Sequence, residues 1–248
     1  MESTKIECGN SKRLFLQGMI PFLEIGVLYI LGGLVVDEAS KTLSLYSTLL
    51  IPLLQGKILD IGAGVDPITK DAVIFDKGQG DAQELDRYFP SGSFDTVFSS
   101  HCLEHMVKPR EALQAWFSLV KPGGFLITIV PDEDLYEQGH FPSIFNSDHK
   151  ATFTLSKSHS WSPVSYNCLE LANELDGKLV YSALQSDNYD LRKRTFGKLG
   201  VLRFRIFRVL MRLSLFSRVT LKLGIRPFDQ TSGGINVLAQ NCFIVQKT

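Results

Sequence analysis

The sequence predicts an α/β fold with a mostly parallel sheet, because short apolar runs alternate with segments of helical periodicity. The run at residues 57–61 leads into the turn Gly62-Ala63-Gly64, where glycine lets the backbone turn sharply beside a ligand. Further runs suited to strands buried on both faces follow at residues 72–76, 94–99 and 125–130. Strands that alternate with helices are joined by right-handed crossovers, which gives a mostly parallel sheet.

Residues 1–55 are expected to form an apolar, largely helical segment before this core, with a polar break at residues 37–41. The stretch from Leu14 to Val36 is long enough to span a membrane. It contains Glu24, however, and a central acid is unfavourable in hydrocarbon by roughly 2.5–3.5 kcal/mol. We therefore favour helices that pack on the core or on a second subunit, as in a homodimer. A membrane anchor or a signal peptide is the alternative.

The first crossover is predicted to be shortened. Only seven residues, Val65–Asp71, separate the glycine turn from the second apolar run. A complete crossover usually needs about a dozen residues, so Asp66-Pro67 can start no more than a single turn there. The N-terminal segment is expected to cover the sheet face that the missing helix leaves open.

A helix is predicted at residues 108–119, where apolar residues recur with helical spacing, and Gly123-Gly124 is expected to stop it. The elements predicted after the fifth strand are a helix at 164–175, a strand at 178–185 and a last strand at 236–246.

A basic segment lies before the last strand. Residues 192–226 contain eleven Lys and Arg and no acid, while the whole chain has a formal charge of zero. Cations and apolar residues are mixed along this segment, which predicts helices that are inserted before the last strand and cover the ligand site. Peripheral contact with an anionic membrane, through this segment or the N-terminal one, is the second interpretation.

Five motifs, in a fixed order between residues 57 and 132, resemble those of the class I S-adenosylmethionine (SAM)-dependent methyltransferases, particularly the broad type 11 group that acts on small molecules. The motifs are Ile58–Gly64, Asp76 after its apolar run, Gly80–Gln83, Phe94–Met106, and Val120–Gly124 before Phe125–Pro131. The resemblance implies a Rossmann-like core, a seven-stranded sheet with an antiparallel last strand, and SAM as the cofactor.

The same resemblance implies which residues hold SAM. Asp60 is expected beside the ammonium group, Asp76 on the ribose hydroxyls, and Asp81 with the Ala82 amide on the adenine. The full expected set is Asp60, Gly62, Ala63, Gly64, Asp76, Asp81, Ala82, Ser99 and His101. The chain is then one methyltransferase domain, with an N-terminal segment (1–55), a SAM-binding core (56–190), a basic helical insertion (191–230) and a final strand region (231–248).

Histidines are the candidates for catalysis. Methyl transfer from a sulfonium mainly requires alignment, which can supply roughly 7–11 kcal/mol, and a base helps further where the acceptor is a hydroxyl or a protonated amine. The candidate bases are His149, His101 and His140, and His149 is preferred because Asp148 precedes it. For each of them a surface or structural role stays open, and His105 is expected to organise its loop.

A metal ion is not predicted. The acids Asp132, Glu133, Asp134 and Glu137 with His140 could in principle supply oxygen ligands. Their spacing matches no defined metal motif, and acids at the exit of a strand are usually solvated.

Composition limits the cellular setting. With 248 residues and 44% apolar residues, the chain can build the core of one α/β domain. Its four cysteines are scattered, which fits reduced thiols. The expected location is the cytoplasm, with the inner face of a membrane as the alternative.

The predicted function is methyl transfer from SAM to a small molecule or to a sugar of a glycan precursor. The prediction of a sugar acceptor is based on a looser likeness of residues 131–139 and 145–149 to methyltransferases encoded with glycan-assembly enzymes. An RNA ribose methyltransferase and a non-catalytic SAM-fold module at a membrane are the alternatives. Nucleic acid is disfavoured because no Asn/Asp-Pro-Pro-Tyr or Pro-Cys turn is present. A dehydrogenase is disfavoured by Pro67, which stands where a dinucleotide fingerprint has Gly or Ala.

Overall fold

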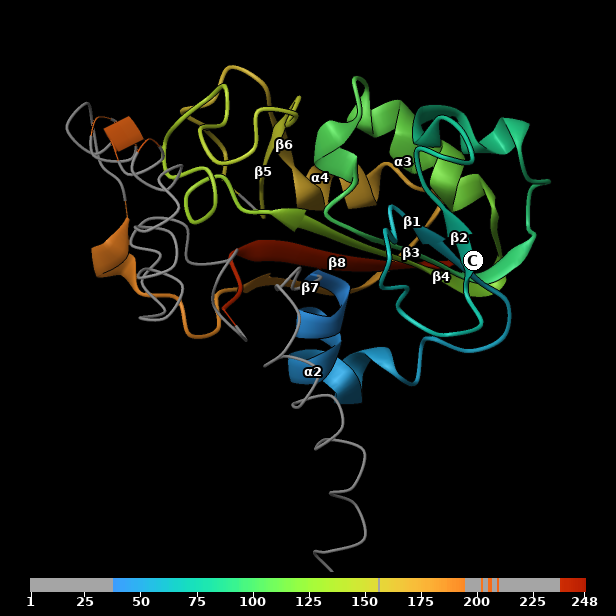
Figure 1. The fold of residues 1–248 in the computed structure, drawn as a ribbon. Helices are drawn as coiled ribbons and strands as arrows, with labels where there is room; N and C mark the ends of the chain where they lie inside the picture. Colours follow the sequence, from blue (N-terminus) through green and yellow to red (C-terminus); the bar gives the residue numbers. More distant parts are fainter. Residues whose placement is uncertain (1–37, 156, 195–201, 203–204, 207–208, 210–236) are drawn as a thin grey trace, which may run out of the picture. The chain divides into compact units, whose positions relative to one another are not determined.

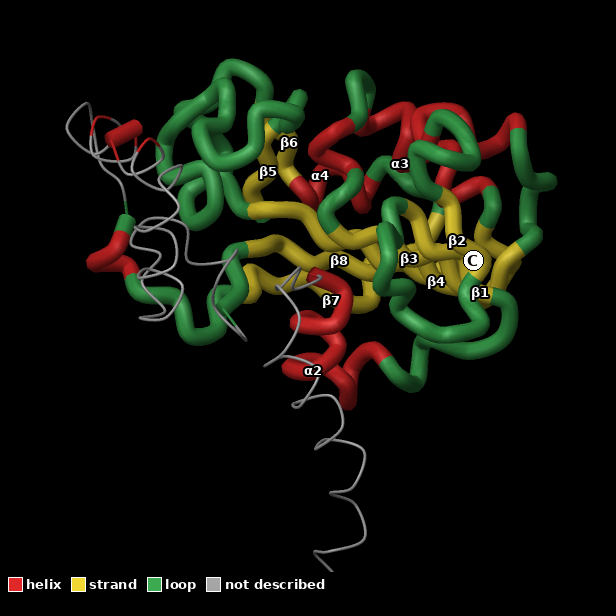
Figure 2. The backbone as a smooth tube through the Cα atoms, in the orientation of Figure 1, coloured by secondary structure: helices red, strands yellow, loops and turns green. Residues whose placement is uncertain are grey.

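A central six-stranded sheet organises the part of the chain that the computed structural model describes, which comprises residues 38–155, 157–194, 202, 205–206, 209 and 237–248 (Figures 1 and 2). The strands are β1 (Ile58–Ile61), β2 (Val73–Phe75), β3 (Phe94–Ser100), β4 (Val120–Pro131), β7 (Gly177–Gln185) and β8 (Gln240–Lys247). Their order in the sheet is β2-β1-β3-β4-β8-β7. β1 pairs in parallel with β2 and β3, β3 pairs in parallel with β4, and β8 runs antiparallel to β4 and β7. The predicted parallel sheet with an antiparallel last strand is confirmed.

The expected seven strands are wrong for the described residues, where the main sheet has six. The segment between β2 and β3 forms a 3-10 helix, η1 (Ala82–Arg87), in place of a strand. Asp81 caps this helix by accepting a hydrogen bond from the Gln83 amide, and the indole of Trp116 donates to the Ala82 carbonyl. Two short strands, β5 (Thr152–Thr154) and β6 (Ser165–Asn167), make a separate two-stranded sheet.

Both faces of the main sheet are buried, as the continuous apolar runs predict. Successive strand residues point to opposite faces, so Leu59 and Ile58 enter two different cores. One core contains apolar residues of α3 (Pro109–Ser118) and α4 (Cys168–Asn173). The other contains apolar residues of α2 (Glu38–Leu50), which lies across the sheet from α3 and α4 in Figure 1.

The shortened first crossover is confirmed, because residues 62–72 form turns without a helix. α2 packs on one face of the sheet, where Leu50 and Ile68 share a core with Phe98. This is the kind of cover that was expected of the N-terminal segment in place of the missing crossover helix. The polar break predicted at residues 37–41 is wrong, since α2 begins at Glu38. Its polar Thr42 is fully buried and accepts a hydrogen bond of 2.8 Å from Gln240 Nε2 on β8, which offsets the cost of burying it.

Two helix boundaries also differ from expectation. α3 agrees with the predicted helix within one residue at each end, but the glycines do not stop it. β4 already begins at Val120, and both glycines lie within it. Position 124 requires glycine because a Cβ there would approach the Asp95 carbonyl oxygen to 2.4 Å. The predicted helix at 164–175 is shorter, and Asn167 explains why. Its side chain accepts hydrogen bonds from the Leu169 and Glu170 amides, so α4 starts at Cys168.

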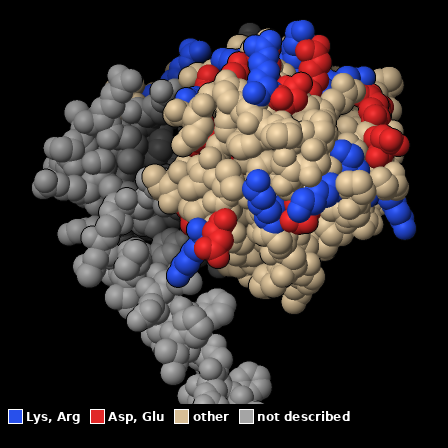
Figure 3. Space-filling model, turned by 90° about the vertical axis from the view of Figure 1, so that its right-hand side faces the viewer, with Lys and Arg blue, Asp and Glu red and all other residues tan. Residues whose placement is uncertain are grey.

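The segments discussed for membrane contact lie mostly outside the described residues, including 14–36 and most of 192–226. Among the residues that are described, no helix combines the length and apolarity needed to cross a membrane. Residues 202, 205, 206 and 209 are helical, and Leu202, Ile206 and Val209 are exposed. On the face of the molecule that Figure 3 shows, basic and acidic side chains of the described residues lie next to one another. Cys102, Cys168 and Cys242 are free and buried.

Candidate active site

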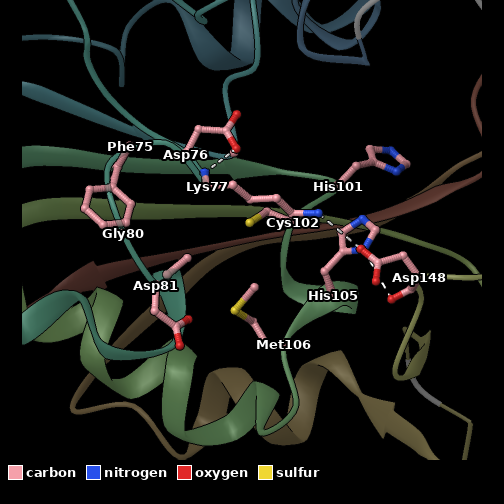
Figure 4. Close-up of a pocket in the computed structure, with 12 residues that line it drawn as sticks. Phe75, Asp76, Lys77, Gly80, Asp81, His101, Cys102, His105, Met106 and Asp148 are labelled. Atoms are coloured by element: carbon pink, nitrogen blue, oxygen red, sulfur yellow. Dashed lines mark hydrogen bonds and ion pairs between the residues drawn. The ribbon is translucent and has the colours of Figure 1, made fainter.

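A pocket of about 380 Å3 opens at the carboxyl ends of β1, β2 and β3 (Figure 4). This is the edge at which open α/β sheets bind ligands. Its walls are formed by Gly62, Phe75, Asp76, Lys77, Gly80, Asp81, Ala82, His101, Cys102, His105, Met106 and Asp148. Of the predicted cofactor residues, Gly62, Asp76, Asp81, Ala82 and His101 are therefore brought together.

Asp76 has the geometry of a residue that can bind a diol. It follows β2 directly, and its two carboxylate oxygens accept hydrogen bonds from the Gly64 amide (2.9 Å) and the Lys77 amide (2.6 Å). Each carboxylate oxygen can accept more than one hydrogen bond, so both retain capacity for a ligand hydroxyl. The bond to Gly64 also ties the glycine turn to the end of β2.

The glycine turn brings its backbone close to the pocket at Gly62. This residue has φ +77°, and a Cβ would meet the Cβ of Cys102 at 2.8 Å, so a larger residue would be both strained and obstructed. Gly64 has φ +58° and open space around it. Ala63 and Gly64 are not among the pocket-lining residues, although Gly64 supports the pocket through Asp76.

The start of η1 forms the pocket wall on the other side of Asp76. Asp81 Oδ1 accepts a hydrogen bond from the Gln83 amide at 2.9 Å, and its backbone amide donates to the Tyr88 hydroxyl at 3.2 Å. Phe75 adds an apolar surface, and its ring packs edge-on against Tyr88 with centroids 4.9 Å apart. An apolar wall beside a carboxylate suits a purine with an exocyclic amino group.

Asp60 and Ser99 lie behind the pocket and do not line it. Asp60 is 1% exposed, and its Oδ2 accepts a hydrogen bond of 2.6 Å from the Ile68 amide. Burial raises the pKa of the Asp60 carboxyl to about 7, and the nearby Asp66 and Asp76 carboxylates also raise it, while the bond from Ile68 lowers it. Ser99 is fully buried, with no hydrogen-bond partner for its hydroxyl. Their contact with SAM stays a prediction.

The other end of the pocket is built from histidines and acids. His101 has φ +53°, a left-handed conformation uncommon outside glycine, and its ring contacts Gln240 Oε1 (3.1 Å) and Glu104 Oε1 (3.5 Å). His105 lines the pocket beside it, with its Nδ1 3.2 Å from Asp148 Oδ2. Burial raises the pKa of Glu104, but contact with His101 and the charges of the neighbouring histidines lower it more, so the net shift is downward.

His149 and His140, predicted as bases, are not among the pocket-lining residues. His149 lies behind His105, with ring centroids 5.0 Å apart, and its side chain is 2% exposed. Its Nδ1 is 2.5 Å from Glu137 Oε1. The Nε2 atom of His140 is buried and has no hydrogen-bond partner. Their catalytic roles remain predictions.

The acids considered for metal binding after β4 have other partners. Asp132 accepts hydrogen bonds from Asn241 and from the Asp134 and Leu135 amides. Glu133 accepts them from the side chains of Thr152, Lys157, Ser160 and Ser165. These contacts orient the segment that follows β4.

Seven pocket residues were not among the predicted cofactor residues: Phe75, Lys77, Gly80, Cys102, His105, Met106 and Asp148. Lys77 Nζ lies 3.3 Å from Asp148 Oδ2, so an exposed ion pair joins two walls that are far apart in the sequence (Figure 4). The position of Cys102–Met106 directly after β3 could have indicated the pocket. Asp148 reaches it through a long irregular loop, which no local pattern could reveal.

A SAM-like ligand fits this arrangement. Figure 4 shows Phe75, Gly80 and Asp81 on one side of the pocket and His101, His105 and Asp148 on the other. Asp76 lies between these two groups. Asp76 would hold the ribose, Asp81 and Ala82 the adenine, and Gly62 would lie near the amino-acid end. The methyl-bearing end would then face the histidines.

The fold and the pocket together have the features of a nucleoside-binding α/β protein, namely a glycine turn after β1 and an acid, Asp76, after β2. Residues 59–128, which run from β1 into β4, match the family model described as a methyltransferase domain. This match supports a class I SAM-dependent methyltransferase with SAM as its cofactor. The match spans the five motifs almost completely, and it covers less than half of the chain.

Solved structures resemble the chain only distantly. A SAM-dependent methyltransferase from Archaeoglobus fulgidus is 16% identical, with a TM-score of 0.47, and the alignment covers 85% of this chain and 95% of that one. Phosphoethanolamine N-methyltransferase 2 from Haemonchus contortus, in complex with SAM, is 16% identical with a TM-score of 0.46, and the alignment covers 82% and 52%. A search of curated protein sequences found no match.

Proposed function

We propose that this methyltransferase acts on an oxygen of a polar small molecule, such as a sugar or a glycan precursor. The observation that carries the proposal is the composition of the pocket end opposite Phe75 and Asp81, where His101, His105 and Asp148 meet. Imidazoles and a carboxylate can accept hydrogen bonds from hydroxyl groups. An apolar acceptor would displace water from these polar side chains without offering them a hydrogen bond, which is unfavourable.

The size of the pocket supports a small acceptor. Its volume of about 380 Å3 is near the lower end for small-molecule sites, which span roughly 300–1,000 Å3. With the nucleoside end taken up by SAM, little enclosed space is left for the acceptor. A larger glycan precursor would extend through the mouth, past the Lys77–Asp148 ion pair.

SAM supplies a methyl group already activated on a sulfonium. When bound, SAM would transfer this methyl group to the acceptor oxygen and keep the bonding electron pair on sulfur, and the hydroxyl proton would pass to an imidazole at the histidine end of the pocket or to water. The residues of the chain orient the two reactants: Asp76 by fixing the ribose, and the histidine end by fixing the acceptor. Alignment of this kind can supply roughly 7–11 kcal/mol.

An acceptor panel tests the proposal. The full-length protein would be incubated with SAM and, separately, with sugars and nucleotide-linked sugars, with small amines, and with RNA, and S-adenosylhomocysteine would be measured. We expect acceptor-dependent product with a hydroxyl compound, mass-shifted by one methyl group on oxygen. Turnover confined to amines or to RNA would contradict the proposal. The same mixtures without acceptor provide the background rate.

A further inference from the structure

We propose that Glu104, His105 and His149 form a binding site for a divalent transition metal ion at the acceptor end of the pocket. One potential ligand atom from each of the three residues lies within 4.8 Å of the other two. Among the described residues, this is the one group of at least three histidines, cysteines and acids that meets this criterion. Two imidazoles and one carboxylate are a ligand set that suits Zn2+ and similar ions.

The two histidines are oriented as metal ligands usually are. His105 Nδ1 lies 3.2 Å from Asp148 Oδ2, and His149 Nδ1 lies 2.5 Å from Glu137 Oε1. Histidines that bind metals commonly hold a carboxylate on the second ring nitrogen, which fixes the tautomer and raises the basicity of the first. In both rings Nδ1 is thereby occupied, which leaves Nε2 as the nitrogen available to an ion; His149 Nε2 lies 3.9 Å from Glu104 Oε1.

Glu104 provides the independent observation. Its side chain is 0% exposed, and neither carboxylate oxygen has a hydrogen-bond partner. The imidazole nitrogens near its Oε1 are at 3.5 Å for His101 Nδ1 and 3.9 Å for His149 Nε2. A buried carboxylate without hydrogen bonds is costly, and a bound cation is one of the few groups that removes this cost.

The charge of the cluster also favours a cation. Glu104 and Glu137 are both buried, and Asp148 adds a third carboxylate at the edge of the pocket. Ligands on one tetrahedral ion, with bonds of about 2.1 Å, lie roughly 3.4 Å apart. The three side chains would therefore draw together by roughly 1–1.5 Å on binding.

Such an ion would serve the acceptor. Three protein ligands leave a coordination position open, and His105 lies both in the cluster and on the pocket wall. An acceptor hydroxyl bound at that position would lose its proton to water more easily, because a metal ion lowers the pKa of a coordinated oxygen. This role rests on the proposed function, whereas the existence of the site does not.

Metal binding is tested without SAM or acceptor. The full-length protein would be treated with a chelator, freed of it, and titrated with Zn2+ or Mg2+ by calorimetry, with Co2+ as a spectroscopic probe of imidazole coordination. We expect one Zn2+ per chain, weaker binding of Mg2+, and visible Co2+ absorption bands. Absence of Zn2+ binding and of Co2+ bands in the wild type would overturn the proposal, while leaving methyl transfer untouched.

Three variants locate the ion. Glu137→Gln removes a carboxylate that orients His149 and should weaken Zn2+ binding by roughly 10–100-fold. His105→Asn removes a ligand at a partly exposed position and should weaken it further. His159→Asn changes an exposed histidine outside the cluster and should have no effect. Unchanged affinity in both Glu137→Gln and His105→Asn, with folding verified by circular dichroism, would overturn the assignment.

Discussion

At the residue scale, Asp76 connects the motif pattern to the chemistry most directly. Its position after the second strand predicts a ribose acid, and in the structure its oxygens bind two loop amides while lining the pocket. Asp81 and His101 were likewise placed at the pocket by their order in the sequence. Asp60 and Ser99 are buried behind it. The orientation of a side chain near the end of a strand depends on the surrounding packing, which the motif does not encode.

Replacing Asp76 should weaken SAM binding. Asp76→Ala removes the acceptor of two ribose hydrogen bonds, and a hydrogen bond to a charged group contributes about 1.5–3 kcal/mol, so the Kd should rise at least about tenfold. Asp86→Ala removes an exposed carboxylate outside the pocket and is the matched control. Calorimetric titration of both variants with SAM measures the difference. Equal affinities would show that the ribose lies elsewhere.

Asp60 should make stability depend on pH in an unusual direction. Its pKa is about 7 in the folded protein and near 3.8 ordinarily, so the folded state binds more protons than the unfolded state between these values. The free energy of unfolding should therefore fall as the pH rises through that window. Asp60→Asn keeps an oxygen for the Ile68 amide but cannot ionise.

The pH dependence separates this variant from the wild type. As the pH rises from about 5 to about 8, the wild type should lose roughly 2–3 kcal/mol of its free energy of unfolding through this group, and Asp60→Asn should not. Urea unfolding at several pH values measures it, with Asp86→Asn as the control at an exposed position. Parallel pH curves for Asp60→Asn and the wild type would refute a raised pKa.

At the scale of elements, the strands were predictable and their surroundings less so. Continuous apolar runs located β1, β3 and the second half of β4, because burial on both faces leaves a clear signal. The shortness of the first crossover also followed from counting residues. The start of α4 was missed because the Asn167 cap interrupts a continuous helical pattern. The start of α2 was missed because its polar side chains have partners in the fold: Ser40 donates a hydrogen bond to Asp66, and Thr42 accepts one from Gln240 on β8.

α2 should stabilise the sheet through one buried side chain in particular. Leu50 is 0% exposed in the core that α2 shares with the sheet, so Leu50→Ala should lower the free energy of unfolding by about 2–5 kcal/mol. Leu45 lies on the same helix but is 36% exposed, so Leu45→Ala should change the free energy of unfolding by less than about 1 kcal/mol. Chemical denaturation compares the two variants. Similar losses would mean that α2 does not pack as described.

At the scale of the whole molecule, the class of the fold followed from the sequence, but the strand count did not. The family resemblance supplied seven strands, whereas the segment between β2 and β3 is held as a 3-10 helix by the Asp81 cap and the Trp116 indole. The pocket joins segments as distant as Gly62 and Asp148, which only tertiary structure brings together. The acceptor end was therefore the least predictable part of the site.

The central claim is that this pocket binds SAM through the Asp76 and Asp81 walls. Isothermal titration of the full-length protein with SAM, and with NAD as the comparison, tests it most directly. We predict saturable binding of one SAM per chain and no measurable binding of NAD. Failure to bind SAM, or binding of NAD with equal affinity, would contradict the account.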